Sequence, residues 1–251
     1  GLGDVYKRQV KWGTVPFYVP FIPLGVWAHP QSISTWGDSA VEVPWTLYME
    51  SGDPQVLADS YDLSRDWVNE VEQYLSPDGV WDRKPDFPLG QLGDWLDPTA
   101  PPEDPTQAMT AKELVATAFY ARSCIQITRI AEILGYADDA ARYAALRDHV
   151  IAGFLDRFIR LDGTMTSDTQ CAYALAIAFG LLDGEPVRKV KAGNCLACLV
   201  RESGGKVSTG FAGTPFVLPA LTQTGHDDEA YQLLTSVSYT HLRAHETDQY
   251  L

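Results

Sequence analysis

Apolar positions recur at helical spacing along most of the chain, and this pattern predicts a protein built from consecutive helices. We expect one helix from Asp38 to Gly52 and a second from Asp53 to about Leu75. Asp38 and Asp53 are typical N-cap residues, and Gly52 is a typical C-terminal stop. Pro54 suits the first turn of the second helix, because the missing N–H of proline costs little there. The apolar positions of the first helix are Val41, Val43, Trp45, Leu47 and Tyr48.

The rest of the chain continues the helix–turn–helix rhythm. Further helices are predicted at 112–134, 138–160, 167–182, 186–203, 215–224 and 227–234. Gly135 is expected to end the first of these, and Ser167 or Asp168 to cap the third. Extended backbone is expected only in short pieces at 15–19 and around Val207. Successive helical hairpins predict an all-α fold, either a solenoid or a closed ring of hairpins.

A long segment rich in proline and glycine, from about Val80 to Thr110, interrupts the helices. Loops of this length are uncommon inside a compact domain and are usually functional. Disorder is the alternative, but Phe87, Leu89 and Leu92 make the segment too apolar for a solvated linker. We therefore expect an ordered loop that either serves a site or packs across one end of the helices.

Two short clusters combine an indole with a carboxylate. The first is Trp36-Gly37-Asp38, and the second is Gly93-Asp94-Trp95-Leu96-Asp97. An indole can cover the apolar face of a sugar ring, and a carboxylate accepts hydroxyl protons in charge-assisted hydrogen bonds. The two clusters therefore favour a carbohydrate site. The alternative is that each tryptophan fills the core and each aspartate caps a helix.

The two ends of the chain are related at the level of DNA. Asp4–Gln9 can be encoded by a string whose reverse complement, read in another frame, encodes Val237–His241. We therefore interpret residues 1–9 and 237–251 as translated sequencing adapter, to be set aside in reasoning about the fold. On this interpretation the genuine segment is 10–236, cut at both ends.

The apolar, aromatic and charged fractions are those of an ordinary globular protein, so a sizeable core is feasible. The formal charge of −14 argues against nucleic acid or an anionic membrane as a partner and favours a neutral substrate. No apolar run is long enough to span a bilayer.

The four cysteines, Cys124, Cys171, Cys195 and Cys198, lie in segments with helical spacing. A metal site would need further ligands close in space, and no histidine or cysteine pair has suitable spacing. We expect reduced, buried, structural thiols and no metal or other cofactor. Reduced thiols favour a reducing compartment such as the cytoplasm.

The run from Trp36 to Tyr48 resembles the corresponding stretch of glycoside hydrolase family 78 catalytic domains, which are α-L-rhamnosidases. Four further runs match in the same order: Gly93–Pro98 with Ala100–Pro102, Leu114–Ala118, Ser167–Gln170 with Ala172–Ala176, and Gly210–Pro215. The resemblance covers essentially all of residues 10–236. It implies a partial (α/α)6 barrel, which agrees with the series of helices.

The family hydrolyses terminal α-L-rhamnosyl groups by inversion, with one carboxylic acid protonating the leaving oxygen and an opposed carboxylate activating water. The resemblance implies that Trp36 and Trp95 line the pocket around rhamnose and that Asp94 accepts a sugar hydroxyl. Asp38 is a second acceptor or, as we prefer, the cap of its helix. The implied substrate is a rhamnosylated small-molecule glycoside or oligosaccharide.

The chain departs from the family pattern at both catalytic positions. The family's general acid is a glutamate after a Cys-Pro pair, and this chain has no such pair. The general base is a glutamate beside a tryptophan, downstream of a run like Gly210–Pro215, and the adapter-like segment at Val237 intervenes before it. We therefore expect both catalytic glutamates outside the chain and the chain alone to be inactive. His29, His149 and His226 receive no catalytic role.

Two other classes of protein fit the same pattern. One is a different hydrolase on a helical barrel, such as a glucosidase or a trehalase-like enzyme, which would use the same indoles and carboxylates. The other is a non-catalytic helical scaffold that binds protein, which predicts large exposed apolar stripes. For an enzyme, Thr209 and Gly210 are expected near the cleft.

Overall fold

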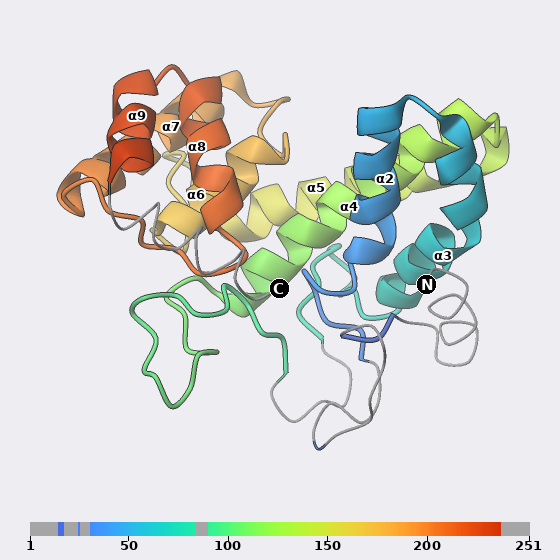
Figure 1. The fold of residues 1–251 in the computed structure, drawn as a ribbon, viewed down its shortest axis with the longest axis horizontal. Coiled ribbons are helices and arrows are strands. Elements are labelled where there is room, and N and C mark those ends of the chain that lie inside the picture. The colour runs from blue at the N-terminus through green and yellow to red at the C-terminus, as the bar shows by residue number, and fades with distance from the viewer. Residues whose placement is uncertain (1–14, 18–24, 26–30, 84–89, 237–251) are drawn as a thin grey trace. The chain divides into compact units, whose positions relative to one another are not determined.

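The computed structural model of the chain describes residues 15–17, 25, 31–83 and 90–236 (Figure 1). The helices in these ranges are α2 (Ser39–Ser51), α3 (Pro54–Glu72), α4 (Lys112–Leu134), α5 (Ala137–Phe158), α6 (Gln170–Ala178), α7 (Pro186–Glu202), α8 (Thr214–Gln223) and α9 (Asp227–Thr235). The chain divides into two units, residues 1–92 with 116–154 and residues 93–115 with 155–251. The adapter-like segments and His29 lie outside the described residues.

The first unit contains the hairpin of α2 and α3, and its turn follows the prediction. Gly52 takes a left-handed conformation (φ 68°) and its N–H donates to the Tyr48 carbonyl, which ends α2. The Asp53 carboxylate accepts the Gln55 N–H, which begins α3 with Pro54 in the first turn. Short-range cap and turn chemistry therefore determines where these two helices meet.

Aromatic side chains form the centre of the first unit. The rings of Trp67 and Trp81 meet edge to face with centroids 6.2 Å apart, and Trp81 meets Tyr120 in the same way at 6.0 Å. All three side chains are fully buried. They join α3, the segment after it and α4 into one core, and such pairs add to the free energy gained from burial.

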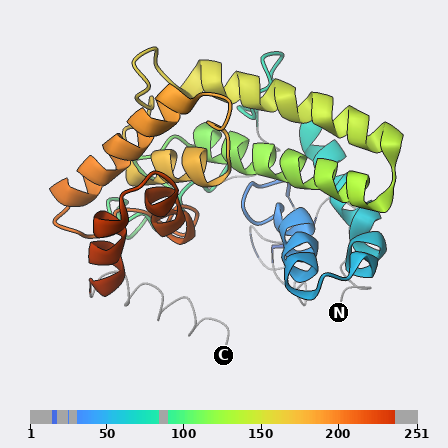
Figure 2. The same ribbon diagram turned by 90° about the horizontal axis from the view of Figure 1, so that it is seen from above.

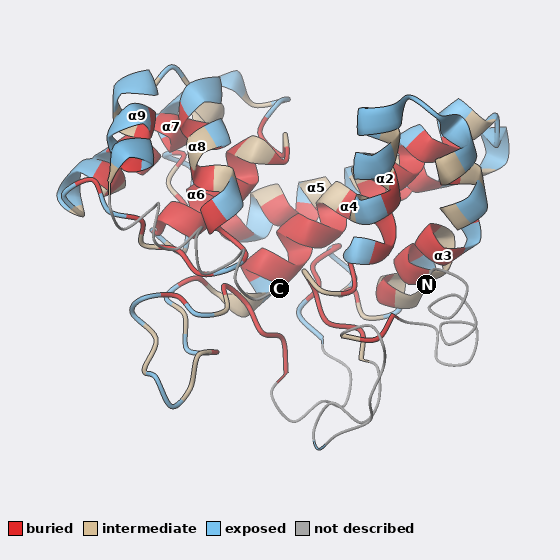
Figure 3. Ribbon diagram, viewed as in Figure 1, coloured by how far each residue is buried: buried red, intermediate tan, exposed pale blue. Residues whose placement is uncertain are grey.

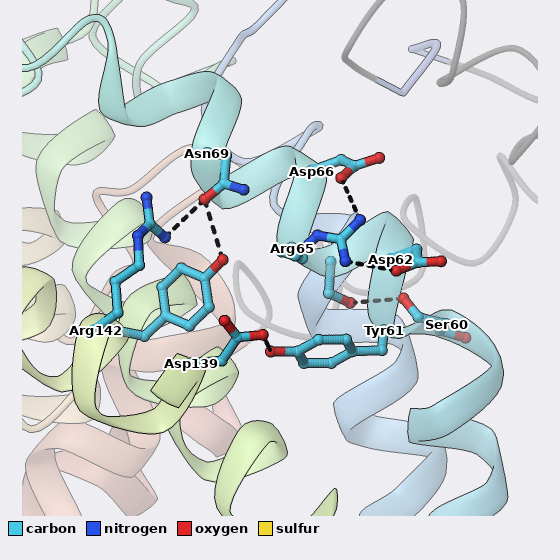
Figure 4. Close-up of polar contacts among 10 residues, drawn as sticks. Ser60, Tyr61, Asp62, Arg65, Asp66, Asn69, Asp139 and Arg142 are labelled. Carbon is cyan, nitrogen blue, oxygen red and sulfur yellow. Dashed lines mark hydrogen bonds and ion pairs between the residues drawn. The ribbon is translucent and has the colours of Figure 1, made fainter. Parts of the chain in front are cut away.

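Polar contacts on the flank of this core hold α3 against α5 (Figure 4). The Tyr61 hydroxyl donates to Asp139 Oδ2 at 2.6 Å. Asn69 Oδ1 accepts from the Arg142 guanidinium at 2.8 Å and from the Tyr143 hydroxyl at 3.0 Å. Burial and the carboxylate of Asp139 raise the pKa of Tyr61, so the phenol stays protonated and remains the donor.

The apolar positions of α2 are not buried along the whole length of the helix. Its buried residues are Ala40, Val41 and Pro44, and all three lie in the first half of the helix. Val43 and Leu47 are each 47% exposed. Helical spacing shows which side chains share a face, but it does not show how far along the helix a neighbour covers that face.

Helices α4 and α5 run antiparallel and are joined at Gly135, which has a φ of 76° (Figure 2). The bounds of α4 are those predicted, and α5 differs by two residues or fewer at each end. Most of α4 is buried (Figure 3). The amphipathic pattern of α5 is confirmed, because its predicted inner residues are all buried: Tyr143, Leu146, Val150, Phe154 and Phe158.

The second unit is built around α6, which packs against α7 and α8, while α9 packs against α8. Its residues from Gln170 to Ile177 are all buried, and alternate alanines let the neighbouring helices approach closely. The bounds predicted for α7, α8 and α9 are confirmed to within one residue. This small-residue helix is therefore the centre of the unit.

The prediction for α6 itself is wrong at both ends. Its N-cap is Thr169, whose hydroxyl accepts the Ala172 N–H, because Ser167 and Asp168 are used elsewhere. Ser167 accepts the Ala111 N–H at 3.1 Å, and Asp168 accepts the Tyr173 hydroxyl proton at 2.8 Å. The helix stops before Gly180, whose φ is 73°.

The extended segments expected at 15–17 and around Val207 do not form strands, and residues 18 and 19 lie outside the described ranges. Among the described residues, an isolated bridge pairs Ile159 with Met165. None of the described helices has the length and apolar character needed to cross a membrane.

The four cysteines are free thiols, but only two of them are buried as expected. Cys124 and Cys171 are buried, Cys195 is partly exposed and Cys198 is exposed. The Cys198 thiol donates to Glu202 one turn later. The prediction of a buried thiol is therefore wrong for Cys198, because that face of α7 lies towards solvent.

Candidate functional site

The first aromatic-acidic cluster forms a short loop directly before α2. Asp38 is at the N-cap position, but its carboxylate does not cap the helix as expected. One carboxylate oxygen, Oδ2, accepts the Thr35 N–H at 2.7 Å. The other, Oδ1, accepts the Trp67 indole N–H at 3.1 Å and the Ser123 hydroxyl proton at 2.7 Å. Asp38 therefore joins its own loop to α3 and α4.

Two conflicting effects act on the Asp38 carboxylate. Burial raises its pKa, while the hydrogen bonds from Ser123, Thr35 and Trp67 oppose that shift. The side chain is 3% exposed. Both oxygens already accept hydrogen bonds from the protein, so this carboxylate is a structural hydrogen-bond acceptor in the observed geometry.

The backbone of this loop is held in an unusual shape. Thr35 has a φ of 72°, a left-handed conformation that costs a β-branched residue about 1–3 kcal/mol. Gly37 packs closely against the Trp67 ring, and a Cβ built on Gly37 would be 2.0 Å from the ring carbon Cη2. Only glycine fits there, which explains the middle residue of the cluster.

Several buried polar atoms in and beside this loop have no hydrogen-bond partner among the described residues. They are the hydroxyls of Ser34 and Thr35 and the amide nitrogen of Gln91. The amide oxygen of Gln91 accepts the Ser34 N–H at 2.9 Å, so the side chain does contact the loop. An unsatisfied buried group costs about 1–3 kcal/mol, so this loop is energetically expensive.

A bidentate ion pair anchors the start of α2. The Arg122 guanidinium donates to both carboxylate oxygens of Glu42, at 2.7 and 2.6 Å, and Gln126 donates to the same carboxylate at 2.7 Å. A fork-to-fork pair of this kind fixes direction as well as distance. The first turn of α2, and with it the loop before α2, is therefore fixed to α4.

The second cluster lies in the loop before α4, within the second unit. Asp94 is fully buried, and its carboxylate accepts two backbone N–H groups, from Gly210 at 2.8 Å and from Gly213 at 2.9 Å. Burial raises the pKa of Asp94 to about 6, although those two hydrogen bonds oppose the shift, and the nearby Asp97 adds to it. Asp94 thus clamps the loop that precedes α8.

The backbone around Trp95 is tightly packed against the same loop. The Phe211 N–H donates to the Trp95 carbonyl at 2.6 Å. A Cβ on Gly210 would lie 2.3 Å from the Trp95 carbonyl oxygen and 2.4 Å from that of Asp94. Leu96 has a φ of 62°, a left-handed conformation that is rare outside glycine. The geometry of this turn is therefore fixed by Gly210.

The remainder of the second loop is ordered by its own carboxylates. One oxygen of Asp97 accepts from the Thr99 N–H and hydroxyl at 2.8 and 2.7 Å, and the other accepts the Met109 N–H at 3.3 Å. Asp104 accepts similarly from Thr106. The predicted ordered loop is confirmed for residues 90–110, while Phe87 and Leu89 lie outside the described residues.

The two indoles of the clusters differ from the core tryptophans. Trp36 and Trp95 are each partly exposed, whereas Trp67 and Trp81 are fully buried. Neither cluster tryptophan is sealed in the core as Trp67 and Trp81 are. Trp36 lies in the first unit and Trp95 in the second. Each side chain extends from a loop whose backbone is held by buried hydrogen bonds.

The structure places the other candidates as follows. Gly210 contacts the Asp94 turn directly, and the Thr209 hydroxyl pairs with that of Thr214 in a buried contact at 2.8 Å. His149 is exposed, and His226 precedes α9 without a side-chain cap. Among the described residues there is no cluster of potential metal ligands.

Sequence reasoning missed the partners that fix the two clusters. Gln91, Ser123 and Gly213 were not singled out, although they hold Ser34, Asp38 and Asp94. The signal for Gly213 was present, since a glycine-rich stretch often brings main-chain N–H groups close to a carboxylate. A serine or glutamine inside an otherwise apolar pattern was a weaker signal.

The helical hairpins and the fixed aromatic loops define an all-α protein of the helical-hairpin class with candidate carbohydrate-binding side chains. The chain belongs to the bacterial alpha-L-rhamnosidase 6 hairpin glycosidase domain family, whose model matches residues 1–242. This membership confirms the predicted (α/α)6 barrel class and the resemblance to family 78.

Named relatives and solved structures agree with this assignment. The chain is 37% identical over 202 residues to an alpha-L-rhamnosidase of Streptomyces avermitilis, which covers 80% of this chain and 18% of that protein. It is 32% identical over 246 residues to an alpha-L-rhamnosidase of Alteromonas sp. (strain LOR), which covers 95% of this chain and 25% of that protein. The chain thus spans a quarter or less of the length of these relatives.

The crystal structure of native α-L-rhamnosidase from Aspergillus terreus is similar to the chain, with a TM-score of 0.85 and 30% identity, over 97% of this chain and 28% of that one. The Streptomyces avermitilis alpha-L-rhamnosidase, solved in complex with L-rhamnose, gives a TM-score of 0.79 and 33% identity, over 97% of this chain and 22% of that one. These relatives are glycoside hydrolases, which supports an enzyme parent for the chain.

Proposed function

We propose that this chain is part of an inverting α-L-rhamnosidase, which removes terminal α-L-rhamnosyl groups from small-molecule glycosides or oligosaccharides. The relatives that carry this name, and the one solved with L-rhamnose, support the substrate class. The observation that carries the proposal at the level of residues is the pair of partly exposed indoles, Trp36 and Trp95, on fixed loops.

In this proposal each indole is an apolar contact surface for sugar. Rhamnose has C–H faces and a methyl group, and both favour contact with an aromatic ring. The loops keep each indole in place before the sugar arrives, so little conformational entropy is lost on binding. Trp36 and Trp95 are therefore assigned to substrate binding.

Asp94 was predicted to accept a sugar hydroxyl, and Asp38 to do so or, preferably, to cap its helix. The hydrogen bonds of both residues favour an indirect role. Both oxygens of each carboxylate already accept hydrogen bonds from protein donors. We propose that each shapes the loop that carries the neighbouring indole. Neither is assigned as general acid or base, and the two catalytic glutamates are expected elsewhere in the whole protein.

The charge of the chain supports a neutral substrate. A formal charge of −14 repels nucleic acid and anionic membranes and leaves the affinity for an uncharged glycoside unaffected. We propose a neutral rhamnoside as the partner. The rival classes, a different helical-barrel hydrolase and a protein-binding scaffold, are decided by the experiment below.

The test uses the full-length enzyme from the parent gene and compares initial rates on an aryl α-L-rhamnoside and an aryl α-glucoside. Trp36→Ala and Trp95→Ala are each expected to lower kcat/KM on the rhamnoside by roughly tenfold or more, since losing an aromatic contact costs on the order of 1.5 kcal/mol. Trp45→Ala is the matched control, because Trp45 is also partly exposed but lies outside both clusters. Hydrolysis of the glucoside alone would refute the assignment as an α-L-rhamnosidase. So would equal losses in all three variants.

A further inference from the structure

The loop from Ser34 to Asp38 is fixed by more contacts than a connection between two segments requires. The Ser34 N–H donates to Gln91, the Thr35 N–H donates to Asp38, and the Gly37 N–H donates to the Ile33 carbonyl at 3.0 Å. Gly37 also rests on the Trp67 ring with no room for a Cβ. The backbone therefore has one accessible path through this loop.

This path carries unusual costs that are concentrated within a few residues. Thr35 is held in the left-handed region, which a β-branched residue avoids. Within the part of the chain that the structure describes, the hydroxyls of Ser34 and Thr35 and the amide nitrogen of Gln91 are buried without partners. Strain and unsatisfied groups persist in a fold where the surrounding structure enforces them, and they gather at binding sites.

The side chain that benefits from this geometry is Trp36. Within the loop, Ser34, Gly37 and Asp38 are buried, while Thr35 and Trp36 are partly exposed. Trp36 is the large apolar side chain that follows the strained residue directly. A change of φ at Thr35 would swing the backbone of residue 36 and redirect its indole.

We propose that Asp38 is a positioning residue for Trp36. One carboxylate oxygen holds the Thr35 N–H, while Trp67 and Ser123 hold the other oxygen, so the carboxylate keeps Thr35 in its left-handed conformation. That conformation sets the direction in which the Trp36 indole leaves the loop. The value of this role for sugar binding rests on the proposed function, whereas the positioning itself does not.

The test uses the full chain labelled with 5-fluorotryptophan, in which the Trp36→Phe variant assigns the fluorine resonance of residue 36. Asp38→Asn keeps the size of the side chain but replaces one acceptor oxygen by an N–H donor. We expect the Trp36 resonance to shift or broaden and the affinity for L-rhamnose to fall by roughly tenfold. Ser64→Ala is the control, since Ser64 is buried beside α2 and donates to the Ala40 carbonyl. It should leave both readouts unchanged.

A rescue variant separates positioning from a purely structural role. Glycine adopts a positive φ without being held, so Thr35→Gly combined with Asp38→Asn should restore most of the lost affinity. A structural role for Asp38 predicts no rescue. An unchanged Trp36 resonance in a folded Asp38→Asn chain, or equal losses in the Ser64→Ala control, would overturn the proposal.

One measurement needs no variant and covers the case in which Asp38→Asn does not fold. In the unaltered chain, the Thr35 N–H, which donates to Asp38, should exchange with solvent far more slowly than the amide of Leu161, a residue that is 96% exposed. Exchange at the rate of an unstructured peptide would contradict the proposal. If the unaltered chain does not bind L-rhamnose, the proposed function of Trp36 fails in this chain, while the resonance and exchange data still decide the positioning.

Discussion

Replacing Gly210 by alanine tests whether the second aromatic loop is held by contact with the loop before α8. Gly210 does not occupy the left-handed region, so alanine adds no backbone strain and the effect comes from space alone. The new Cβ would lie 2.3 Å from the Trp95 carbonyl oxygen, 2.4 Å from that of Asp94 and 2.7 Å from the Asp97 nitrogen. These are main-chain atoms, which cannot move aside as the end of a flexible side chain can.

The expected loss of stability follows from these contacts. Separating the two loops weakens the hydrogen bonds from the Gly210 N–H to Asp94 and from the Phe211 N–H to the Trp95 carbonyl. One bond to a carboxylate and one neutral bond contribute about 2–3 kcal/mol together. Overpacking adds roughly 1 kcal/mol or more. We therefore expect Gly210→Ala to lower the free energy of unfolding by about 3 kcal/mol.

The assay is urea unfolding of the full chain followed by far-ultraviolet circular dichroism. Gly184→Ala is the matched control in the same unit, because no atom lies within 4 Å of the Cβ it would add. The control should stay within about 0.5 kcal/mol of the unaltered chain. If Gly210→Ala behaved like the control, the loops would not be held by this contact and the reasoning would be refuted.

Three further predictions concern other parts of the molecule. The pKa of Asp94 is raised from 3.8 to about 6 in the folded chain, so the folded chain holds this proton more strongly than the unfolded chain does. Stability relative to Asp94→Asn should therefore fall by roughly 3 kcal/mol as the pH rises from about 4 to above 6. A difference in stability that does not change with pH in urea titrations would contradict this. Tyr61→Phe should cost about 1–2 kcal/mol in urea unfolding through the lost bond to Asp139. No loss, or the same loss in an Asp139→Ala background that has no acceptor, would show that this bond contributes little. The exposed Val43 and Leu47 should make the folded chain bind a hydrophobic dye, and serine at both positions should reduce the fluorescence; an undiminished signal would place the dye elsewhere.

The helices could be predicted from the sequence because their signals are local. Asp53-Pro54 and Gly52 lie within one turn of the bounds they set, and the bounds of α4 follow from periodicity and Gly135. The predicted start of α6 was wrong because both candidate caps have other partners. Ser167 and Asp168 were equally good caps by residue type, but Ser167 accepts the Ala111 N–H and Asp168 accepts a hydrogen bond from the Tyr173 hydroxyl.

The candidate site could be predicted only in part for the same reason. Residue type identified Trp36 and Asp94, and their exposure and burial follow from contacts that the sequence does not show. The Asp38 carboxylate reaches Ser123, 85 positions away, and Asp94 reaches Gly210, 116 positions away. An aspartate before a helix predicts a cap, but the carboxylate of Asp38 instead accepts hydrogen bonds that include one from the distant Ser123. Pairings over such separations are set by the packing of whole helices.

These separations also bear on any attempt to engineer the molecule. A graft of residues 34–38 or 93–97 into another helical scaffold would carry the tryptophan but leave behind the glutamine, serine or glycine amides that give the loop its shape. The transplanted segment would then relax, since nothing would keep Thr35 or Leu96 at a positive φ. Changes of ligand preference are therefore better sought by exchanging the aromatic side chains in place than by moving the loops that present them.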